Sequence, residues 1–244
     1  MTISLLLLTH NRRPLVQRCF ESLAFTLERN DVVEWLIVDN ASTDDTPGYL
    51  RHFIRAQPKV SCLFSQWNRG VAGGRDYLLR RARGDVVVLL DSDTVIDGAA
   101  FPDNLVAALR RPGVGIVGAA AHFVPAGWKW PFVVAGDDYE GQCDLVPGFC
   151  QAFRRGLTES CRMDLTFNPY WLEDTDFCFQ ASLRGHTIWS LPRAACGVRH
   201  EWGKSGASNS DFAAKYQYFV EKWRGKNVVA FERKEMRGCP TGCT

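Results

Sequence analysis

The sequence predicts an α/β protein built on a mainly parallel, Rossmann-like sheet flanked by helices. Four segments in the first hundred residues are almost continuously apolar, as parallel strands covered on both faces are. Helical patterns separate these segments, and such alternation implies right-handed crossovers. The predicted strands are ISLLLL (3–8), EWLIV (34–38), VSCLF (60–64) and DVVVLL (85–90).

Three helices are expected between these strands, over residues 14–26, 47–56 and 72–82. Pro14 suits the first position of the first helix, because its fixed backbone angle is already helical. Thr46 and Pro47 provide a cap and a first residue for the second helix. The face expected to pack in the first helix consists of Leu15, Cys19, Leu23 and Phe25 or Thr26.

The second half of the chain has a less regular pattern. Helices are expected over 101–111 and 173–184, and a strand over 187–191. Between them, the glycine-rich segment 113–124 suggests a strand pair or a bent strand, and 127–136 suggests an exposed segment or a hairpin. A last helix is expected to turn an apolar stripe to the core rather than to a ligand. Its residues are Phe212, Tyr216, Phe219, Val220 and Trp223.

Composition excludes several classes of protein. The hydrophobic content of 46% is typical of a globular domain, and a net charge of +2 gives no basis for binding nucleic acid. The opening MTISLLLLTHNRRP lacks a basic start and a cleavage site, so we expect a first strand there, with no signal peptide or transmembrane segment. No strong linker divides the chain, so a single domain is expected over 1–225, followed by a tail over 226–244.

Nine cysteines without a CxxC pair favour reduced, mostly buried thiols and a cytoplasmic location. Cys239 and Cys243, in RGCPTGCT, differ from the others in their Gly/Pro-rich surroundings. We expect them to belong to a flexible tail, and the alternatives are a redox pair or half of a metal site shared with another chain.

Polar residues follow each of the first four predicted strands. Since the carboxyl ends of parallel strands share one edge of a sheet, we expect these residues to meet at a ligand site. They are Thr9-His10-Asn11, Asp39-Asn40-Ala41-Ser42, Asn68-Arg69-Gly70 and Asp91-Ser92-Asp93.

The stretch VVVLLDSDT (86–94) places two carboxylates at the end of a buried strand. A carboxylate beside a core is unfavourable unless a hydrogen bond, a cation or water compensates it. In an extended chain, Asp91 and Asp93 project to the same side and repel each other unless a cation lies between them. Mg²⁺ or Mn²⁺ with a diphosphate suits such oxygens. The alternative is that Asp93 caps the turn and a following helix.

Two further motifs carry polar chemistry. In NRGVAGGRD (68–76) the glycines allow a ligand to approach the backbone at a helix start, and Arg75 either binds phosphate or pairs with Asp76 or Asp45. In WLEDTDFCF (171–179) the three acids either complement the helix dipole or include a general base. His200 is either structural or a metal ligand.

Taken in order, these motifs resemble the family-2 glycosyltransferases of the type A (GT-A) nucleotide-sugar-binding fold. The matching stretches are ISLLLLTHNR, EWLIVDNASTDDT, NRGVAGGRDYLLRRARGDVVVLLDSDT, GFCQAFRR, PYWLEDTDFCFQASLRGHTIWSLP and RH before EWGKS. Together they cover roughly residues 3 to 224. The resemblance implies a nucleotide-sugar-binding half over 1–98 and an acceptor half over 99–225.

The resemblance also implies roles for individual residues. Asp39 matches the aspartate that bonds to the nucleobase, and Asp91 and Asp93 match the metal-binding DxD pair. Asp174 matches the catalytic base, and His200 matches a metal or diphosphate ligand of some members. The remaining nucleotide-binding residues are Thr9, Asn11, Asn68, Gly70 and Arg75, and the supporting acids are Glu173 and Asp176.

The expected activity is a metal-dependent, inverting transfer of one sugar from a nucleoside-diphosphate sugar to an acceptor hydroxyl. Mn²⁺ or Mg²⁺ is the expected cofactor, and UDP or dTDP is weakly favoured as the donor nucleotide. The acceptor is a glycan, a lipid-linked glycan, a peptide or a small molecule. The alternatives are a nucleotidyltransferase and a non-catalytic glycan- or nucleotide-binding module.

The aromatic segment GWKWPFVVAG leaves a last question open. Trp128, Trp130 and Phe132 either stack on an acceptor sugar, touch the inner surface of a membrane as a peripheral contact, or belong to a packed hairpin, which is the favoured interpretation.

Overall fold

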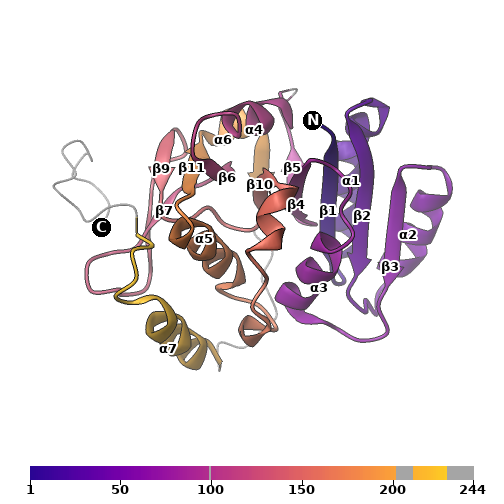
Figure 1. Cartoon of the computed structure of the whole chain (residues 1–244). Helices are drawn as coiled ribbons and strands as arrows, with labels where there is room; N and C mark the ends of the chain where they lie inside the picture. The colour runs from indigo at the N-terminus through magenta and orange to yellow at the C-terminus, as the bar shows by residue number, and fades with distance from the viewer. Residues whose placement is uncertain (99, 202–210, 230–244) are drawn as a thin grey trace.

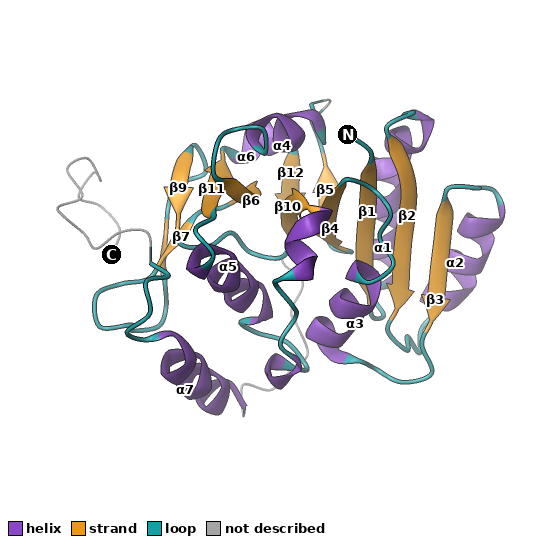
Figure 2. Ribbon diagram, in the orientation of Figure 1, coloured by secondary structure: helices purple, strands orange, loops and turns teal. Residues whose placement is uncertain are grey.

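An eight-stranded sheet forms the centre of the protein (Figures 1 and 2). The computed structural model describes residues 1–98, 100–201 and 211–229. Neighbouring strands follow the order β3-β2-β1-β4-β10-β6-β11-β9. These strands are β1 (Ile3–Thr9), β2 (Val32–Asp39), β3 (Val60–Phe64), β4 (Val86–Asp91), β6 (Val114–Ala119), β9 (Gly141–Cys143), β10 (Cys150–Arg154) and β11 (Thr187–Leu191).

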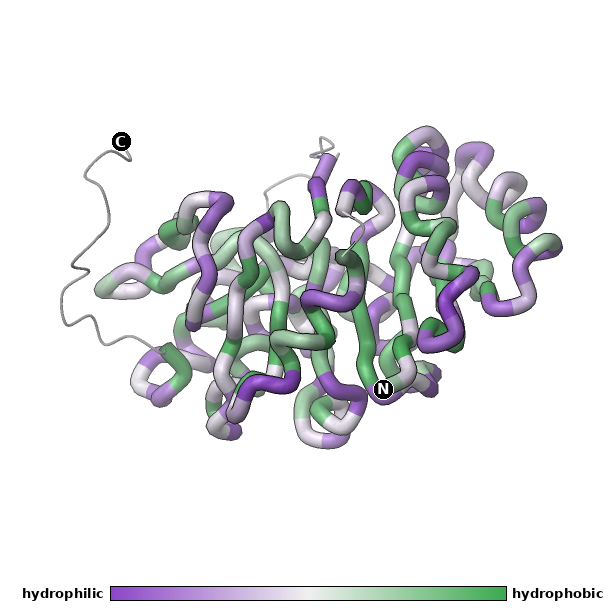
Figure 3. Tube along the Cα trace, turned by 90° about the horizontal axis from the view of Figure 1, so that it is seen from above, coloured by the Kyte–Doolittle hydropathy of each residue, from purple (hydrophilic) through white to green (hydrophobic). Residues whose placement is uncertain are grey.

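The first four strands are parallel to one another, as the sequence predicts. β1 lies between β2 and β4, and all seven of its residues are buried. Alternate side chains of one buried strand enter the two opposite cores, which is why the strand is apolar at every position. Figure 3 shows hydrophobic residues concentrated along the strands and hydrophilic ones in the outer loops.

Helices cover both faces of the sheet. One core contains the inward side chains of α1, α2 and α4, and the other contains those of α3, α5 and α7. The helices are α1 (Arg13–Leu23), α2 (Thr46–Arg55), α3 (Gly70–Leu79), α4 (Asp103–Ala108), α5 (Glu173–Leu183), α6 (Arg193–Cys196) and α7 (Phe212–Trp223). The 3₁₀ segments are η1 (Ala24–Glu28), η2 (Arg155–Glu159) and η3 (Leu165–Phe167).

The predicted helices are present, with differences in detail. In α1 the buried face is formed by Val16, Cys19, Phe20 and Leu23, so Leu15 is not among its buried residues. Of the two alternatives at the end of this face, Thr26 is buried and Phe25 is 41% exposed, and both belong to η1, which follows Leu23. The predicted cap of α2 is wrong, because Thr46 is the first residue of the helix and its side chain makes no capping hydrogen bond. The Thr46 N–H donates instead to Asp44 Oδ1 at 2.9 Å.

The second half completes the sheet with two strands that the sequence analysis did not predict. β10 is antiparallel to both β4 and β6, and β9 is antiparallel to β11. The predicted segment 113–124 divides into β6 and the short strand β7 (His122–Phe123), which pairs with β8 (Val133–Val134). The segment 127–136 thus belongs to a hairpin.

The aromatic residues of this hairpin pack against α5 and α7. Phe132 is 5% exposed, and the Trp128 ring contacts Phe179 and Phe219. Trp130 is 41% exposed, yet its ring centroid lies 5.1 Å from that of Phe212. The packed interpretation is therefore confirmed, and the α7 stripe is confirmed as a core contact through Phe219 and Trp223.

A second, two-stranded sheet lies beside the end of β4. β5 (Thr94–Ile96) pairs in antiparallel fashion with β12 (Val198–His200), and His200 stands opposite Thr94. The short helix α6 comes directly before β12 in the chain. This pairing brings residue 200 to the tip of β4, about a hundred residues away in sequence.

The cysteines of the described residues are reduced. All seven are free, and all except Cys62 are buried, as predicted. Cys239 and Cys243 lie outside the described residues, and so do residues 202–205 of the EWGKS motif. In the described part of the chain, no helix has the length and apolar character needed to cross a bilayer.

Candidate active site

The carboxyl ends of β1, β2 and β4 lie side by side. Thr9 pairs with Asp39 across β1 and β2, and Leu8 pairs with Asp91 across β1 and β4. The arrowheads of β2 and β3 in Figure 2 point to this same edge. The predicted gathering of polar residues at one edge is therefore present for these three strands.

Three candidate metal ligands meet at the tip of β4. Single ligand atoms of Asp91, Asp93 and His200 all lie within 4.8 Å of one another. His200 Nε2 lies 3.0 Å from Asp93 Oδ1, and Arg12 Nη1 donates to Asp93 Oδ2 at 3.1 Å. The His200 ring also stacks on Phe149, with centroids 4.8 Å apart. The alternative of Asp93 as a helix cap is wrong, because β5 and not a helix follows the turn.

The chemistry of this cluster fits a divalent cation. Two carboxylates and one imidazole are ligands that Mn²⁺ accepts, and Mg²⁺ accepts the carboxylates. The Asp91 side chain is 34% exposed, and its Oδ1 bonds to Arg75 at 2.7 Å. Burial raises the pKa of Asp91, and the neighbouring Arg75 guanidinium opposes that rise. A bound cation would further favour the charged form of this carboxylate.

The loops after β1 and β2 form a second polar group. Thr9 and Asp39 are each 2% exposed, and the Thr9 Oγ1 atom is buried without a hydrogen-bond partner among the described residues. Asp39 Oδ1 accepts the backbone N–H of Ser42 at 3.2 Å. Asn11 joins the two loops, since its Oδ1 accepts the N–H of Thr43 at 2.7 Å.

The loop before α3 is held by side-chain amides. Asn68 Oδ1 accepts the backbone N–H of Gly70 and the side-chain N–H of Asn40, both at 2.8 Å. Gly70 has a φ of +69° and lies against Asn168, so a side chain at residue 70 would be strained and would clash. These contacts show how the start of α3 is fixed next to the ends of β2 and β3.

Arg75 lies inside the protein and not at its surface. It is 3% exposed and pairs with Asp91 at 2.7 Å and with Glu173 at 2.9 Å. The suggested pairing of Arg75 with Asp76 or Asp45 is wrong, because Arg75 pairs with Asp91 and Glu173. Asp76 pairs with Arg80 instead. Sequence reasoning also missed Gly148, whose backbone contacts both Arg75 and Asp174.

The three acids at the start of α5 have different surroundings. Asp174 Oδ2 accepts the Gly148 N–H at 2.7 Å, and its Oδ1 accepts the Thr175 N–H at 2.6 Å. Glu173 is 5% exposed, and burial together with the charge of Asp174 raises its pKa to about 7. Asp176 is fully buried and bonds to Lys222 and Trp223 of α7, so it faces away from Arg75.

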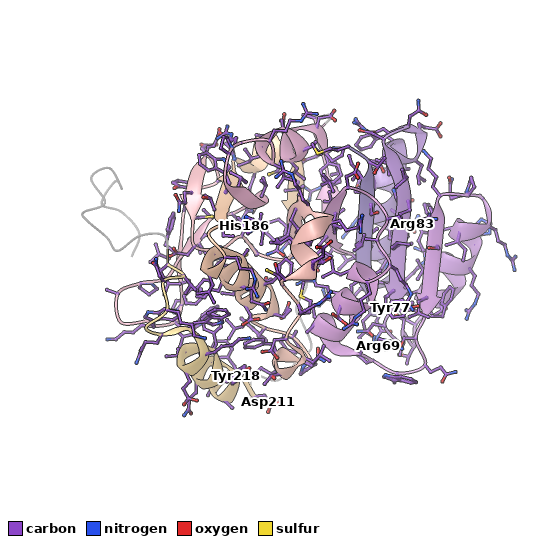
Figure 4. The ribbon with its side chains drawn as sticks, viewed as in Figure 1. Arg69, Tyr77, Arg83, His186, Asp211 and Tyr218 are labelled. Carbon is purple, nitrogen blue, oxygen red and sulfur yellow. The ribbon has the colours of Figure 1, made fainter. Side chains whose placement is uncertain are left out.

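Two open hollows lie near this edge, and neither includes the acidic cluster. One, of about 630 Å³, is bordered by Arg13, Asp44 and Tyr49, and the other, of about 340 Å³, by Trp67, Tyr77 and Leu165. Figure 4 labels Arg69 and Tyr77, which lie on the α3 side of the sheet next to the second hollow. The candidate site is therefore defined by its chemistry, not by the depth of a hollow.

The fold is the GT-A fold, as three similar solved structures show. GalNAc-T7, solved with UDP, GalNAc and Mn²⁺, has a TM-score of 0.76 at 16% identity over 91% of this chain and 48% of its own. The mannosyltransferase PcManGT of Pyrobaculum calidifontis, solved with GDP-Man and Mn²⁺, has a TM-score of 0.62 at 21% identity over 79% and 55%. TarS 1–349 of S. aureus, solved with UDP-GlcNAc, has a TM-score of 0.64 at 18% identity over 90% and 65%.

Sequence comparison gives the family. Residues 4–136 match Glycosyl transferase family 2, and the chain belongs to that family. EpsH of Bacillus subtilis strain 168, which is named as a glycosyltransferase, is 27% identical over 204 residues. The match covers 76% of this chain and 57% of EpsH, so the chain spans little more than half of that relative's length.

Proposed function

We propose that this glycosyltransferase is metal-dependent and inverting, and that it moves one sugar from a nucleoside-diphosphate sugar to an acceptor hydroxyl. The observation that carries the proposal is the cluster of Asp91, Asp93 and His200 at the edge that also presents Asp39. Asp91, Asp93 and His200 would hold Mn²⁺ or Mg²⁺, which when bound supplies charge to a diphosphate leaving group. Two of the similar solved structures contain Mn²⁺.

The residues of β1, β2 and α3 are proposed to bind the nucleotide. Asp39 and the buried hydroxyl of Thr9 offer polar atoms to a base and ribose beside β1 and β2. Asn11, Asn68 and Gly70 act by holding the loops that shape this pocket, since each bonds to or packs on neighbouring loop residues. Arg75 is proposed to act from inside the protein, because its guanidinium already bonds to two carboxylates.

Asp174 is proposed as the general base. Of the three acids at the start of α5, it is the one without an ion pair among the described residues, whereas Glu173 pairs with Arg75 and Asp176 with Lys222. Its oxygens accept from Gly148 and Thr175, which orients the carboxylate and leaves acceptor capacity for a substrate hydroxyl. One base and one displacement suffice for inversion. Glu173 supports the base by its position, while Asp176 is proposed to have a structural role.

A thermal-shift panel tests this proposal. UDP, dTDP, GDP and CDP are each added with and without Mn²⁺, because a ligand of the folded state raises the melting temperature. We expect a nucleotide shift that depends on Mn²⁺, with UDP or dTDP the largest. Asp93→Asn should abolish the Mn²⁺ dependence, whereas the matched control Asp97→Asn, at an exposed residue near β5, should keep it.

The panel also separates the alternatives. No shift with any nucleotide would favour a binding module of another kind. A shift with nucleoside triphosphates that exceeds the diphosphate shift would favour a nucleotidyltransferase. The acceptor, whether a glycan, a lipid-linked glycan, a peptide or a small molecule, requires a separate transfer assay with the donor that the panel identifies.

A further inference from the structure

Arg75 is the most deeply buried arginine at the candidate site. Its side chain is 4% exposed, although guanidinium groups are rarely buried without several partners. It comes from the second turn of α3, and its partners come from three other parts of the chain. It therefore joins segments that are far apart in sequence.

The guanidinium group binds both acidic elements of the site at once. Nη2 donates to Asp91 Oδ1 at 2.7 Å, at the tip of β4, and Nη1 donates to Glu173 Oε1 at 2.9 Å, at the first residue of α5. The rigid fork of an arginine fixes the distance between two such carboxylates, which a lysine cannot do. One side chain thus connects the start of α5 to the tip of β4.

Gly148 extends the connection to the proposed base. Its carbonyl oxygen accepts from Arg75 Nη2 at 3.0 Å, and its N–H donates to Asp174 Oδ2 at 2.7 Å. A Cβ atom at residue 148 would clash with the guanidinium group of Arg75, so only glycine leaves room for it. The same peptide segment thus contacts both Arg75 and the candidate base.

We propose that Arg75 is a positioning residue that sets Asp91, a metal ligand, and Asp174, the base, in register with each other across the active site. This inference rests on the proposed function for the roles of those two carboxylates. In this proposal Arg75 does not bind substrate or metal itself, since its guanidinium group is buried and bonded to Asp91 and Glu173. It acts through Asp91 directly and through Glu173 and Gly148 on the start of α5.

The test replaces Arg75 by methionine and compares it with Arg80→Met, at the exposed residue that follows the last residue of the same helix. Loss of a residue that orients metal ligands typically lowers metal affinity or activity by about 10- to 100-fold. We expect Arg75→Met to weaken Mn²⁺ binding and to lower kcat by about that factor, with a smaller change in the donor KM. Arg80→Met should leave all three unchanged.

Two further variants separate positioning from loss of a buried charge. Gly148→Ala displaces the guanidinium group while every charge is kept, and we expect it to lower kcat as Arg75→Met does. Arg75→Lys keeps a charge but not the fork, so we expect it to recover thermal stability more than kcat. Hydrogen exchange at 91–94 and 173–176 should rise together in Arg75→Met and Gly148→Ala.

The proposal is overturned if Arg75→Met, assayed where it is folded, keeps kcat and the Mn²⁺ dissociation constant within about twofold of wild type. It is also overturned if hydrogen exchange rises in only one of the two segments. If the wild-type protein binds no Mn²⁺ and shows no transfer, the proposed function fails. The hydrogen-exchange comparison still decides whether Arg75 couples β4 to α5.

Discussion

At the scale of single residues, the three acids of the α5 start show how similar carboxylates acquire different roles. Asp174 is bonded to backbone N–H groups, Glu173 to a buried guanidinium group, and Asp176 to a lysine and an indole. The sequence WLEDTDFCF identified the cluster but not this division, because the partners come from segments far away in sequence. The partners therefore decide which acid is available to a substrate.

Asp174→Asn should lower kcat by about 10²- to 10⁴-fold, since the amide cannot accept the proton of an acceptor hydroxyl. Donor binding should change little, because Asp174 does not belong to the β1, β2 and α3 group. Steady-state transfer kinetics and nucleotide thermal shifts measure the two effects. Asp138→Asn, at an exposed residue, is the control. Loss of nucleotide binding equal to the loss of turnover would remove Asp174 from the role of base.

Glu173 should make folding stability depend on pH. Its pKa in the folded protein, about 7, is above the ordinary value of 4.5, so the folded state holds a proton that the unfolded state has released. The free energy of unfolding then falls as pH rises from 4.5 to 7, by about 3 kcal/mol at most for this group.

The comparison variant for this effect is Glu173→Gln, which cannot ionise. Urea unfolding across the same pH range should show a stability difference, wild type minus variant, that decreases as pH rises. If the two proteins show the same dependence of stability on pH, Glu173 stays ionised across this range because of its ion pair with Arg75. Absolute stabilities are not compared, because the variant also weakens the bond to that arginine.

At the scale of elements, buried parallel strands were predictable and their antiparallel neighbours were not. β1 to β4 are nearly continuous apolar runs, and their parallel direction follows from the helices between them. β10, CQAFR, contains a buried glutamine whose side chain bonds to Val146 O, so it lacks a purely apolar pattern. β9 has three residues, too few for a periodicity to appear.

The candidate site was predictable to the same extent. The acids at the tip of β4 and the residues ending β1 and β2 lie together because parallel strands end at one edge. The partners of Arg75 and the packing of Phe149 on His200 could not be predicted, because they depend on the β5–β12 pairing and on the position of α5. The sequence analysis also missed Val16 and Phe20 on the buried face of α1, and did not predict that η1 follows this helix at Leu23.

Lys222 fixes α7 to the rest of the protein. Its ammonium group lies 2.7 Å from both Asp164, before η3, and Asp176, in α5. Figure 4 places Tyr218, on the same helix, at this side of the molecule, and its hydroxyl donates to Asp164 at 2.8 Å. With Asp176 fully buried, the lysine is the cation that compensates its charge.

Lys222→Met should therefore destabilise the fold by about 3 kcal/mol, because it leaves a buried carboxylate without its cation. For a chain of this size that corresponds to a fall in melting temperature of about 6 to 12 °C. The control is Lys226→Met, at an exposed residue that follows the same helix. A melting temperature equal to that of the control would mean that Trp223 and Gln180 suffice to stabilise Asp176.

At the scale of the whole molecule, one sheet runs through both predicted halves of the chain. β4 belongs to residues 1–98 and β10 to the second half, and the two are hydrogen-bonded neighbours. β10 also pairs with β6, which in turn pairs with β11. The candidate site lies at this junction, since Asp91 and Asp93 come from the first half and Asp174 and His200 from the second.

This continuity leads to a prediction about cooperativity. We propose that residues 1–225 unfold as one domain, so calorimetry should show a single transition whose calorimetric and van't Hoff enthalpies agree. The enthalpy should be about 150 kcal/mol near 60 °C for a chain of this length. A fragment of residues 1–98 should not fold on its own, because β4, a strand with five buried apolar residues, would become an edge strand without its hydrogen-bonded neighbour β10. Two separate transitions, or a folded 1–98 fragment with sharp amide signals, would show instead that the halves are independent domains and that the active site is assembled between them.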